Sequence, residues 1–180
     1  FKIHETLVKY YPVEYHAQAP VNCVFAIMDE HGITAEDIER VDNETSEAGV
    51  SIIADEPEKW RPETRETADH SMPYCIARAF LDGEMTLGQF SKEKITSQRA
   101  REFMECIEVT ENPTFTESYG DDFAHRMTVH TSDDTIVHEV RYTKGHYENP
   151  LTDAEITEKN RMGNEGCQGE AARKEEVGLA

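Results

Sequence analysis

A lysine and a histidine stand seven residues apart in the segment KYYPVEYHAQAP, residues 9–20, just ahead of an apolar run. An ammonium group such as that of Lys9 holds carboxylates, and an imidazole such as that of His16 exchanges protons near neutral pH. The segment leads into a helix expected from about Pro20, and a helix N-terminus carries free N–H groups and a partial positive charge. The combination predicts a carboxylate-binding corner with a proton-transfer group. The simpler alternative is that Lys9 is solvated and that His16 caps its own helix.

A second group of polar residues precedes a second predicted helix. Asp69, His70 and Ser71 stand immediately before a helix whose first turn contains Pro73. Asp69 is placed to fix the tautomer of His70, as carboxylates do for working histidines. Tyr74 follows His70 by four residues, which can bring the two onto one helix face. The alternative is a capping cluster, with Ser71 as N-cap, that only satisfies backbone donors.

The remaining histidines give weaker signals. His146 follows a glycine in the loop KGHYENP, and we take it either as a substrate-binding candidate or as an exposed residue. His130 and His138 fall on a predicted hairpin, where a metal site would need a third ligand that the sequence does not supply. We therefore predict no metal site. The chain also lacks the G-x-S-x-G, G-x-G-x-x-G and P-loop patterns, which removes the commoner nucleophile and nucleotide sites.

Hydrophobic spacing indicates which elements would position these groups. Helices are expected over residues 21–31, from Ser71 to Gly83, over residues 97–107, and from about Thr152, which would cap the last of them. Strands are expected over residues 3–11, 38–45 and 107–113 and in a hairpin over residues 126–143. Residues 47–54 are expected to form a short buried segment, for which the pattern does not decide between helix and strand. Helices interspersed with antiparallel strands predict an α+β fold, a two-layer domain with an antiparallel sheet packed against helices. Residues 161–180 have little to bury and are expected to form a polar, flexible tail.

Composition narrows the class of protein. Asp and Glu number 37 against 18 Lys and Arg, which gives a net charge of −19 over 180 residues. So negative a surface repels phosphate backbones and anionic lipid, and we expect neither nucleic-acid nor membrane binding. Because the excess is spread along the chain, we interpret it as a solvation device of the kind used in high-salt cytoplasm; the alternative is an acidic mesophilic protein. The cysteines are expected to be buried free thiols, and no signal peptide or membrane span is evident, so we expect a cytoplasmic protein.

Three stretches, in the same order as in the family, resemble the MmgE/PrpD proteins. They are YPVEYHAQAPV at residues 11–21, KWRPETRETADHSMPYCIARAFLDGEMTLGQF at residues 59–90 and GHYENPLTDAEITEKN at residues 145–160. Together they cover most of residues 5–160. One departure is Ser46, which stands where the dehydratases of the family have a histidine.

The resemblance implies an architecture. Residues 1–160 would form the smaller, lid-like α+β domain that follows a large helical N-terminal domain, and that helical domain is absent from this chain. The start at Phe1, without a methionine, fits a piece of a longer protein. The family's active site lies in the cleft between the two domains and uses no metal or organic cofactor. A tricarboxylate substrate, the helical domain and a second copy of the protein are the implied partners.

The resemblance also implies an activity. The nearest family reaction is the dehydration of 2-methylcitrate to 2-methyl-cis-aconitate in propionate metabolism, and a close relative decarboxylates cis-aconitate with a lysine at the position matching Lys9. We expect Lys9 and His16 to be catalytic and to bind substrate, His70 and Tyr74 to be second-rank catalytic residues, and Ser71 and His146 to bind substrate. The alternatives are another activity on a polycarboxylate, such as decarboxylation or epimerisation, and a mainly structural domain for dimerisation or closure. We expect the isolated chain to be inactive.

Overall fold

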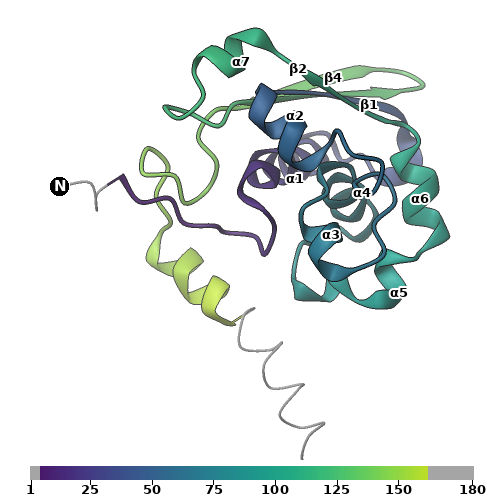
Figure 1. The fold of residues 1–180 in the computed structure, drawn as a ribbon, viewed down its shortest axis with the longest axis horizontal. Coiled ribbons are helices and arrows are strands. Elements are labelled where there is room, and N and C mark those ends of the chain that lie inside the picture. Colours follow the sequence, from purple (N-terminus) through teal and green to yellow (C-terminus); the bar gives the residue numbers. More distant parts are fainter. Residues whose placement is uncertain (1–4, 162–180) are drawn as a thin grey trace, which may run out of the picture.

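Four strands form one sheet, and the helices α1 and α4 pack beneath it (Figure 1). The computed structural model describes residues 5–161 of the chain. The strands are β1 (Ile38–Thr45), β2 (Ile107–Glu111), β3 (His125–Thr131) and β4 (Thr135–Val140), and they lie in the order β2–β1–β3–β4. β3 is antiparallel to β1 and to β4, but β1 and β2 are parallel. The α+β class is confirmed, whereas the sheet is mixed and not wholly antiparallel.

The parallel pair follows from a long connection. Between β1 and β2 the chain passes through five helices, which is enough to carry it back to the same edge of the sheet in the same direction. β3 and β4 form the expected hairpin around the SDD turn, where the Thr131 amide donates to the Asp134 carbonyl at 2.9 Å. The turn residues therefore predicted the pairing of β3 with β4, whereas the parallel pairing of β1 with β2 depends on the long connection.

The described residues contain eight α-helices. They are α1 (Gln18–His31), α2 (Glu47–Ile53), α3 (Arg65–Asp69), α4 (Met72–Asp82), α5 (Lys92–Ile95), α6 (Gln98–Met104), α7 (Pro113–Glu117) and a last helix over residues 153–161. Short 3-10 turns occupy Tyr15–Ala17, Ala35–Asp37 and Leu87–Phe90. The last helix lies apart from the sheet, below the N-terminal segment in the view of Figure 1.

The two central helices end at the predicted glycines and α4 begins as predicted, whereas α1 begins at Gln18, two residues before the expected start near Pro20. α1 has Pro20 in its first turn and ends at Gly32, whose φ of 65° is left-handed. α4 has Ser71 as its N-cap, with the hydroxyl accepting from the Tyr74 amide, and ends at Gly83, with φ 68°. Their apolar faces form the core with the inward side chains of the strands, among them Val24, Ile27, Val41, Ile76, Phe80, Met127 and Val129. Burial of these side chains is the main favourable term that holds the helices on the sheet.

Several expected elements differ. Residues 5–11 form no strand, residues 47–53 are helical, and α6 ends three residues before the end of the predicted helix. The strand predicted over residues 107–113, with a proline stop, ends at Glu111. Pro113 instead opens a helix, because Asn112 caps it by accepting from the Thr114 amide at 3.0 Å. The helix from residue 153 is capped by Thr152 as predicted. Beyond Arg161, the predicted tail lies outside the described residues.

A buried histidine opens β3, one of the two inner strands of the sheet. His125, in β3, is 1% exposed, and its Nε2 contacts the Asn43 side-chain oxygen of β1 at 3.1 Å. The other ring nitrogen, Nδ1, has no hydrogen-bond partner among residues 5–161. Burial therefore lowers the pKa of His125 to about 3, because a proton on Nδ1 would place an unsolvated charge in the core. The folded state holds His125 neutral.

A glycine fixes the N-terminal segment. The Val8 amide donates to the Gly145 carbonyl at 2.8 Å, and Gly145 has a φ of 86°. A Cβ at residue 145 would overlap the Val8 carbonyl oxygen. Glycine is thus required both for the backbone angle and for the close approach. The contact sets the course of the main chain immediately before Lys9.

We predict that His125 gives the fold a pH dependence. The unfolded chain binds a proton below about pH 6.5 and the folded chain only near pH 3, so the free energy of unfolding should fall as the pH drops, by about 1.4 kcal/mol per pH unit at full slope. Urea titrations at pH 7 and pH 4.5 measure this fall. His125→Gln should lack this part of it, whereas His138→Gln, on the neighbouring strand, should keep it. Equal slopes for the wild type and His125→Gln would contradict the prediction.

We predict that Gly145→Ala frees the N-terminal segment. Amide hydrogen exchange at Val8 should accelerate by about 10-fold or more, because its hydrogen bond cannot form around the added methyl group. The matched control is Gly83→Ala, which has a similar positive φ but open space around it; it should cost roughly 1–2 kcal/mol of stability and leave Val8 protected. The prediction is wrong if both variants change Val8 exchange alike.

Candidate active site

His16 is held by a carboxylate two residues before it. Glu14 is the N-cap of the turn Tyr15–Ala17, where its side chain accepts from the His16 amide at 2.6 Å. The same carboxylate lies 3.0 and 3.1 Å from the ring nitrogen Nδ1 of His16. Because an ionised carboxylate only accepts hydrogen bonds, Nδ1 carries the proton and Nε2 keeps its lone pair. The local turn thus selects one tautomer of the imidazole.

The other side of the imidazole meets aromatic residues from a distant loop. The Tyr119 hydroxyl lies 3.0 Å from Nε2 of His16, and the two rings are stacked, with centroids 5.7 Å apart and an interplanar angle of 14°. Phe123 presents its edge to the same imidazole, also at 5.7 Å. The His16 side chain is only 9% exposed, whereas Tyr119 is 42% exposed. Glu14, His16, Tyr119 and Phe123 form what we call the His16 cluster.

Glu14 gives the His16 cluster a negative charge. Burial alone would raise the pKa of Glu14, but hydrogen bonds from the His16 side chain and from the His16 and Tyr15 amides, with the charge that His16 gains on protonation, outweigh it and bring the pKa below its usual value. Glu14 is therefore an anion at neutral pH. An anion on Nδ1 stabilises the imidazolium that forms when Nε2 takes up a proton, so the arrangement suits a general base.

Lys9 is exposed, and its ammonium group has no ion pair or hydrogen bond within the described part of the chain. The loop between it and α1 is held by Gln18, a fully buried residue of the first helical turn. The Gln18 side-chain oxygen accepts from the amides of Tyr10 and Tyr11, at 3.1 and 3.0 Å. Its side-chain nitrogen donates to the carbonyls of Tyr11 and Val13. One buried amide therefore fixes the loop that carries both predicted residues.

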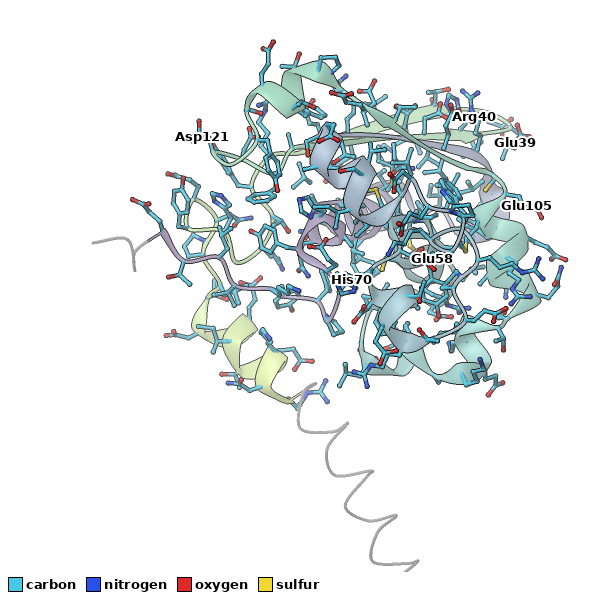
Figure 2. All side chains as sticks on the ribbon, in the orientation of Figure 1. Glu39, Arg40, Glu58, His70, Glu105 and Asp121 are labelled. Carbon is cyan, nitrogen blue, oxygen red and sulfur yellow. The ribbon has the colours of Figure 1, made fainter. Side chains whose placement is uncertain are left out.

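The second predicted group, residues 69–71, touches the loop that carries His16, but not all of its side chains face that loop. The Glu14 amide donates to the Asp69 carbonyl at 3.0 Å, so the two loops touch. His70 is exposed at the C-terminal end of α3, where its Nδ1 contacts the Asp69 carboxylate (Figure 2 labels His70). Ser71 is buried, and its hydroxyl donates to the Lys59 carbonyl while capping α4. That is the capping arrangement given as the alternative.

Two predicted site residues are structural in their placement. Tyr74 is fully buried and donates its hydroxyl to the Gln89 carbonyl at 2.6 Å, and burial raises its pKa far above the usual value. Spacing of four residues did not bring it beside His70, because α4 begins only at Met72. His146 is also buried; its Nδ1 accepts from the Glu148 amide at 3.1 Å, and burial lowers its pKa. The Tyr74 hydroxyl is thus occupied within the core, and Nδ1 of His146 is occupied by a backbone amide.

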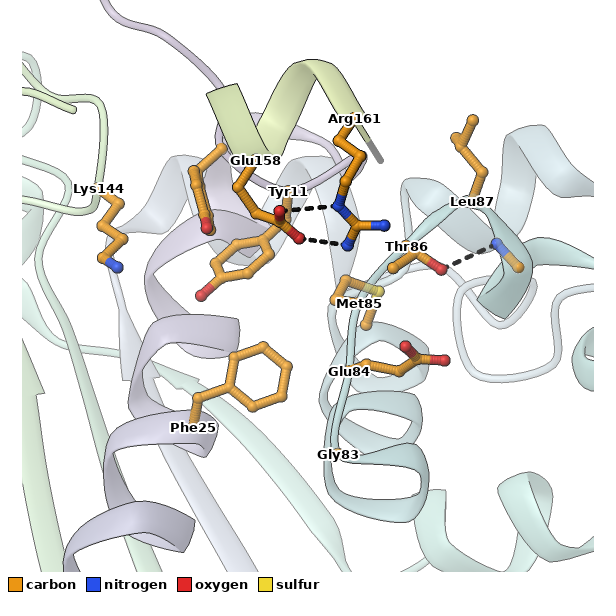
Figure 3. Close-up of a pocket in the computed structure, with 12 residues that line it drawn as sticks. Tyr11, Phe25, Gly83, Glu84, Met85, Thr86, Leu87, Lys144, Glu158 and Arg161 are labelled. Atoms are coloured by element: carbon orange, nitrogen blue, oxygen red, sulfur yellow. Dashed lines mark hydrogen bonds and ion pairs between the residues drawn. The ribbon is translucent and has the colours of Figure 1, made fainter. Parts of the chain in front are cut away.

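A separate pocket of about 540 Å³ lies between the last helix, α1 and residues 83–88 (Figure 3). Tyr11 and Phe25 line one side, and the paired Glu158 and Arg161 stand at its mouth. None of its lining residues belongs to the His16 cluster. Among residues 5–161 no three His, Cys, Asp or Glu side chains gather as metal ligands, and no helix there is long and apolar enough to cross a membrane.

Sequence reasoning missed Tyr119, Phe123, Glu14 and Gln18. Glu14 had a local signal, since a glutamate two residues before a histidine at a helix entrance can cap the turn and reach the ring. Tyr119 had none, because it stands 103 residues from His16 and meets it only through the fold.

Comparison with known proteins agrees with these motifs. The family model of the MmgE/PrpD C-terminal domain matches residues 11–179. The 2-methylcitrate dehydratases of Escherichia coli (strain K12) and Salmonella typhimurium are each 31% identical over 145 residues, which cover 76% of this chain and 29% of those proteins. A probable 2-methylcitrate dehydratase of Saccharomyces cerevisiae is 28% identical over 148 residues, 76% of this chain and 28% of that protein. The chain thus spans less than a third of the length of these relatives. It belongs to the MmgE/PrpD family, in which it corresponds to the C-terminal domain.

Proposed function

We propose that this chain is the C-terminal domain of a lyase that dehydrates 2-methylcitrate to 2-methyl-cis-aconitate, and that His16 transfers the proton. The observation that carries the proposal is the contact of one imidazole with a carboxylate on Nδ1 and with only a hydroxyl on Nε2. The names of the relatives supply the substrate class. The rest of the site would come from the part of the full-length protein that this chain does not span.

The reaction sets the requirements. A proton leaves the carbon next to a carboxylate, the electron pair of that C–H bond forms the double bond, and the hydroxyl departs as water with a second proton. An acid in the part of the full-length protein that this chain does not span would supply that second proton. When the substrate C–H displaces the Tyr119 hydroxyl from the lone pair of Nε2, His16 can accept the first proton there, and Glu14 then stabilises the resulting imidazolium. Holding the carboxylates in place lowers the entropic part of the barrier. Lys9, an exposed ammonium without a described carboxylate partner, would hold one of them.

The remaining predicted residues take secondary places in the proposal. His70 is exposed and lies on the loop that touches Glu14, so it would contact substrate or brace the loop. Ser71, Tyr74 and His146 would support the site through packing and capping only. A homodimer, and a helical domain that closes over this surface, belong to the same proposal.

Two alternative functions are each supported by one observation. Another activity on a polycarboxylate, decarboxylation or epimerisation, needs the same cation and base and is supported by Ser46, where the dehydratases of the family have a histidine. A mainly structural domain is supported by the burial of Ser71, Tyr74 and His146.

We predict that the full-length protein turns over 2-methylcitrate and that Lys9→Ala and His16→Ala each lower kcat by about 100-fold or more, the usual contribution of an acid–base group. The matched controls are Lys92→Ala, whose ammonium contacts only a backbone carbonyl, and His138→Ala. Both should keep wild-type activity, and all four variants should keep the wild-type melting temperature. The 180-residue chain alone should be inactive.

Three outcomes would count against this proposal. Near-normal activity of Lys9→Ala and His16→Ala would favour the structural function. Turnover of cis-aconitate or citrate in place of 2-methylcitrate would favour another family activity. Failure to act on any of the three compounds would remove the substrate class.

We predict that Glu14→Gln lowers kcat by about 10- to 100-fold, because the neutral amide no longer fixes the tautomer or stabilises the imidazolium. Since the pKa of Glu14 is already below its usual value, the loss should be equal at about pH 6 and about pH 8. Glu36→Gln, which removes an exposed carboxylate paired with Arg99, should have no effect. A wild-type kcat for Glu14→Gln would show that the contact between Glu14 and His16 has no part in the reaction.

A further inference from the structure

The loop that carries Tyr119 is anchored by a buried carboxylate. Asp122 is 5% exposed, and its two oxygens accept from the Ser118 hydroxyl at 2.7 Å and from Nη1 of Arg141 at 3.0 Å. The Phe123 amide also donates to the Arg141 carbonyl, at 3.2 Å. A carboxylate is removed from water only where charged or polar partners replace it. Arg141 therefore holds the loop 118–123 by its side chain and by its backbone.

Arg141 is itself fixed by the sheet. Its Nε donates to Glu139 at 3.1 Å, and the other oxygen of Glu139 accepts from Arg126 at 2.9 and 3.1 Å. Arg126 also donates to Glu44 of β1 at 2.8 Å. The guanidinium groups of Arg126 and Arg141 lie over the Phe115 ring, at 5.5 and 5.8 Å from its centre. A series of ion pairs thus connects β1, β3 and β4 to Asp122.

What this anchor secures is the position of one hydroxyl group. Tyr119 is 42% exposed, so it docks with a large part of its surface still in water and is not a core residue. Its hydroxyl nevertheless lies within hydrogen-bond distance of Nε2 of His16, and its ring stacks on the imidazole. With Glu14 on Nδ1, both nitrogens of the ring are held, and the ring plane is set.

We infer that Arg141 and Asp122 are positioning residues for His16, acting through Tyr119. The ion pair keeps Tyr119 in place, and Tyr119 orients the imidazole and donates to the lone pair of Nε2. This inference rests on the proposed function only in assigning proton transfer to His16.

The test compares variants of the chain with the wild type. Tyr119→Phe keeps the ring and removes the hydroxyl, and Arg141→Gln removes the charge that holds Asp122. Arg40→Gln is the matched control: it removes another half-exposed guanidinium from an ion pair, with Asp42, at the far side of the molecule from Asp121 (Figure 2). The first readout is the ¹⁵N resonance of His16 Nε2 in the 180-residue chain, which reports its hydrogen bond whether or not the chain is active. The second is kcat/KM of the full-length protein.

We expect the Nε2 resonance to shift in Tyr119→Phe and in Arg141→Gln and to stay unchanged in Arg40→Gln. kcat/KM should fall about 10-fold in the first two variants, the loss expected for one hydrogen bond to a reacting group, and Arg141→Lys should recover part of it. If Arg141→Gln does not fold, Ser118→Ala removes the other bond to Asp122 and should shift the same resonance.

An unchanged Nε2 resonance in Arg141→Gln, or in Ser118→Ala in its place, would overturn the inference. Shifted resonances in the 180-residue chain, together with a full-length protein that does not act on 2-methylcitrate, would keep the positioning role and remove the proposed function. The two failures are therefore distinguishable.

Discussion

The placement of the candidate site depends on one buried amide, the side chain of Gln18. It makes four hydrogen bonds to the backbone of residues 10–13, two as acceptor and two as donor, from the first turn of α1. A buried amide that lost these partners would be costly, so the loop has little freedom to move away from the helix. α1 is in turn fixed by its apolar face against β3, β4 and α4. Core packing thus determines where Lys9 and His16 lie, although neither belongs to the core.

The rest of the cluster comes from another part of the chain and is held by charge. Tyr119 and Phe123 lie on a loop tied to the sheet through Asp122 and Arg141. With a net charge of −19, the chain uses many of its few cations in such pairs, as Arg78 and Lys94 show on Asp82. Lys9 differs, because no described carboxylate neutralises it. A tricarboxylate would need more cations than this surface offers, and the proposal assigns them to the remainder of the full-length protein.

Sequence reasoning was reliable where local chemistry decides structure. Caps at Ser71 and Thr152, the left-handed glycines at Gly32 and Gly83 and the hairpin follow from residues a few positions apart. It was unreliable where distant segments meet. The parallel pairing of β1 with β2 depends on a crossover, and the contact of His16 with Tyr119 depends on the complete fold. Tyr74 illustrates a third case, since helical spacing indicates which residues share a face but not whether that face is buried.

The most direct test of the central claim, that His16 moves a substrate proton, is deuterium uptake into 2-methylcitrate by the full-length protein in D₂O. The account predicts that the wild type exchanges the C–H hydrogen it removes, because Nε2 carries that proton beside Tyr119, a residue that is 42% exposed to solvent. His16→Gln should show neither exchange nor dehydration while remaining folded. Exchange at the wild-type rate in His16→Gln would contradict the account, because another group would then be the base.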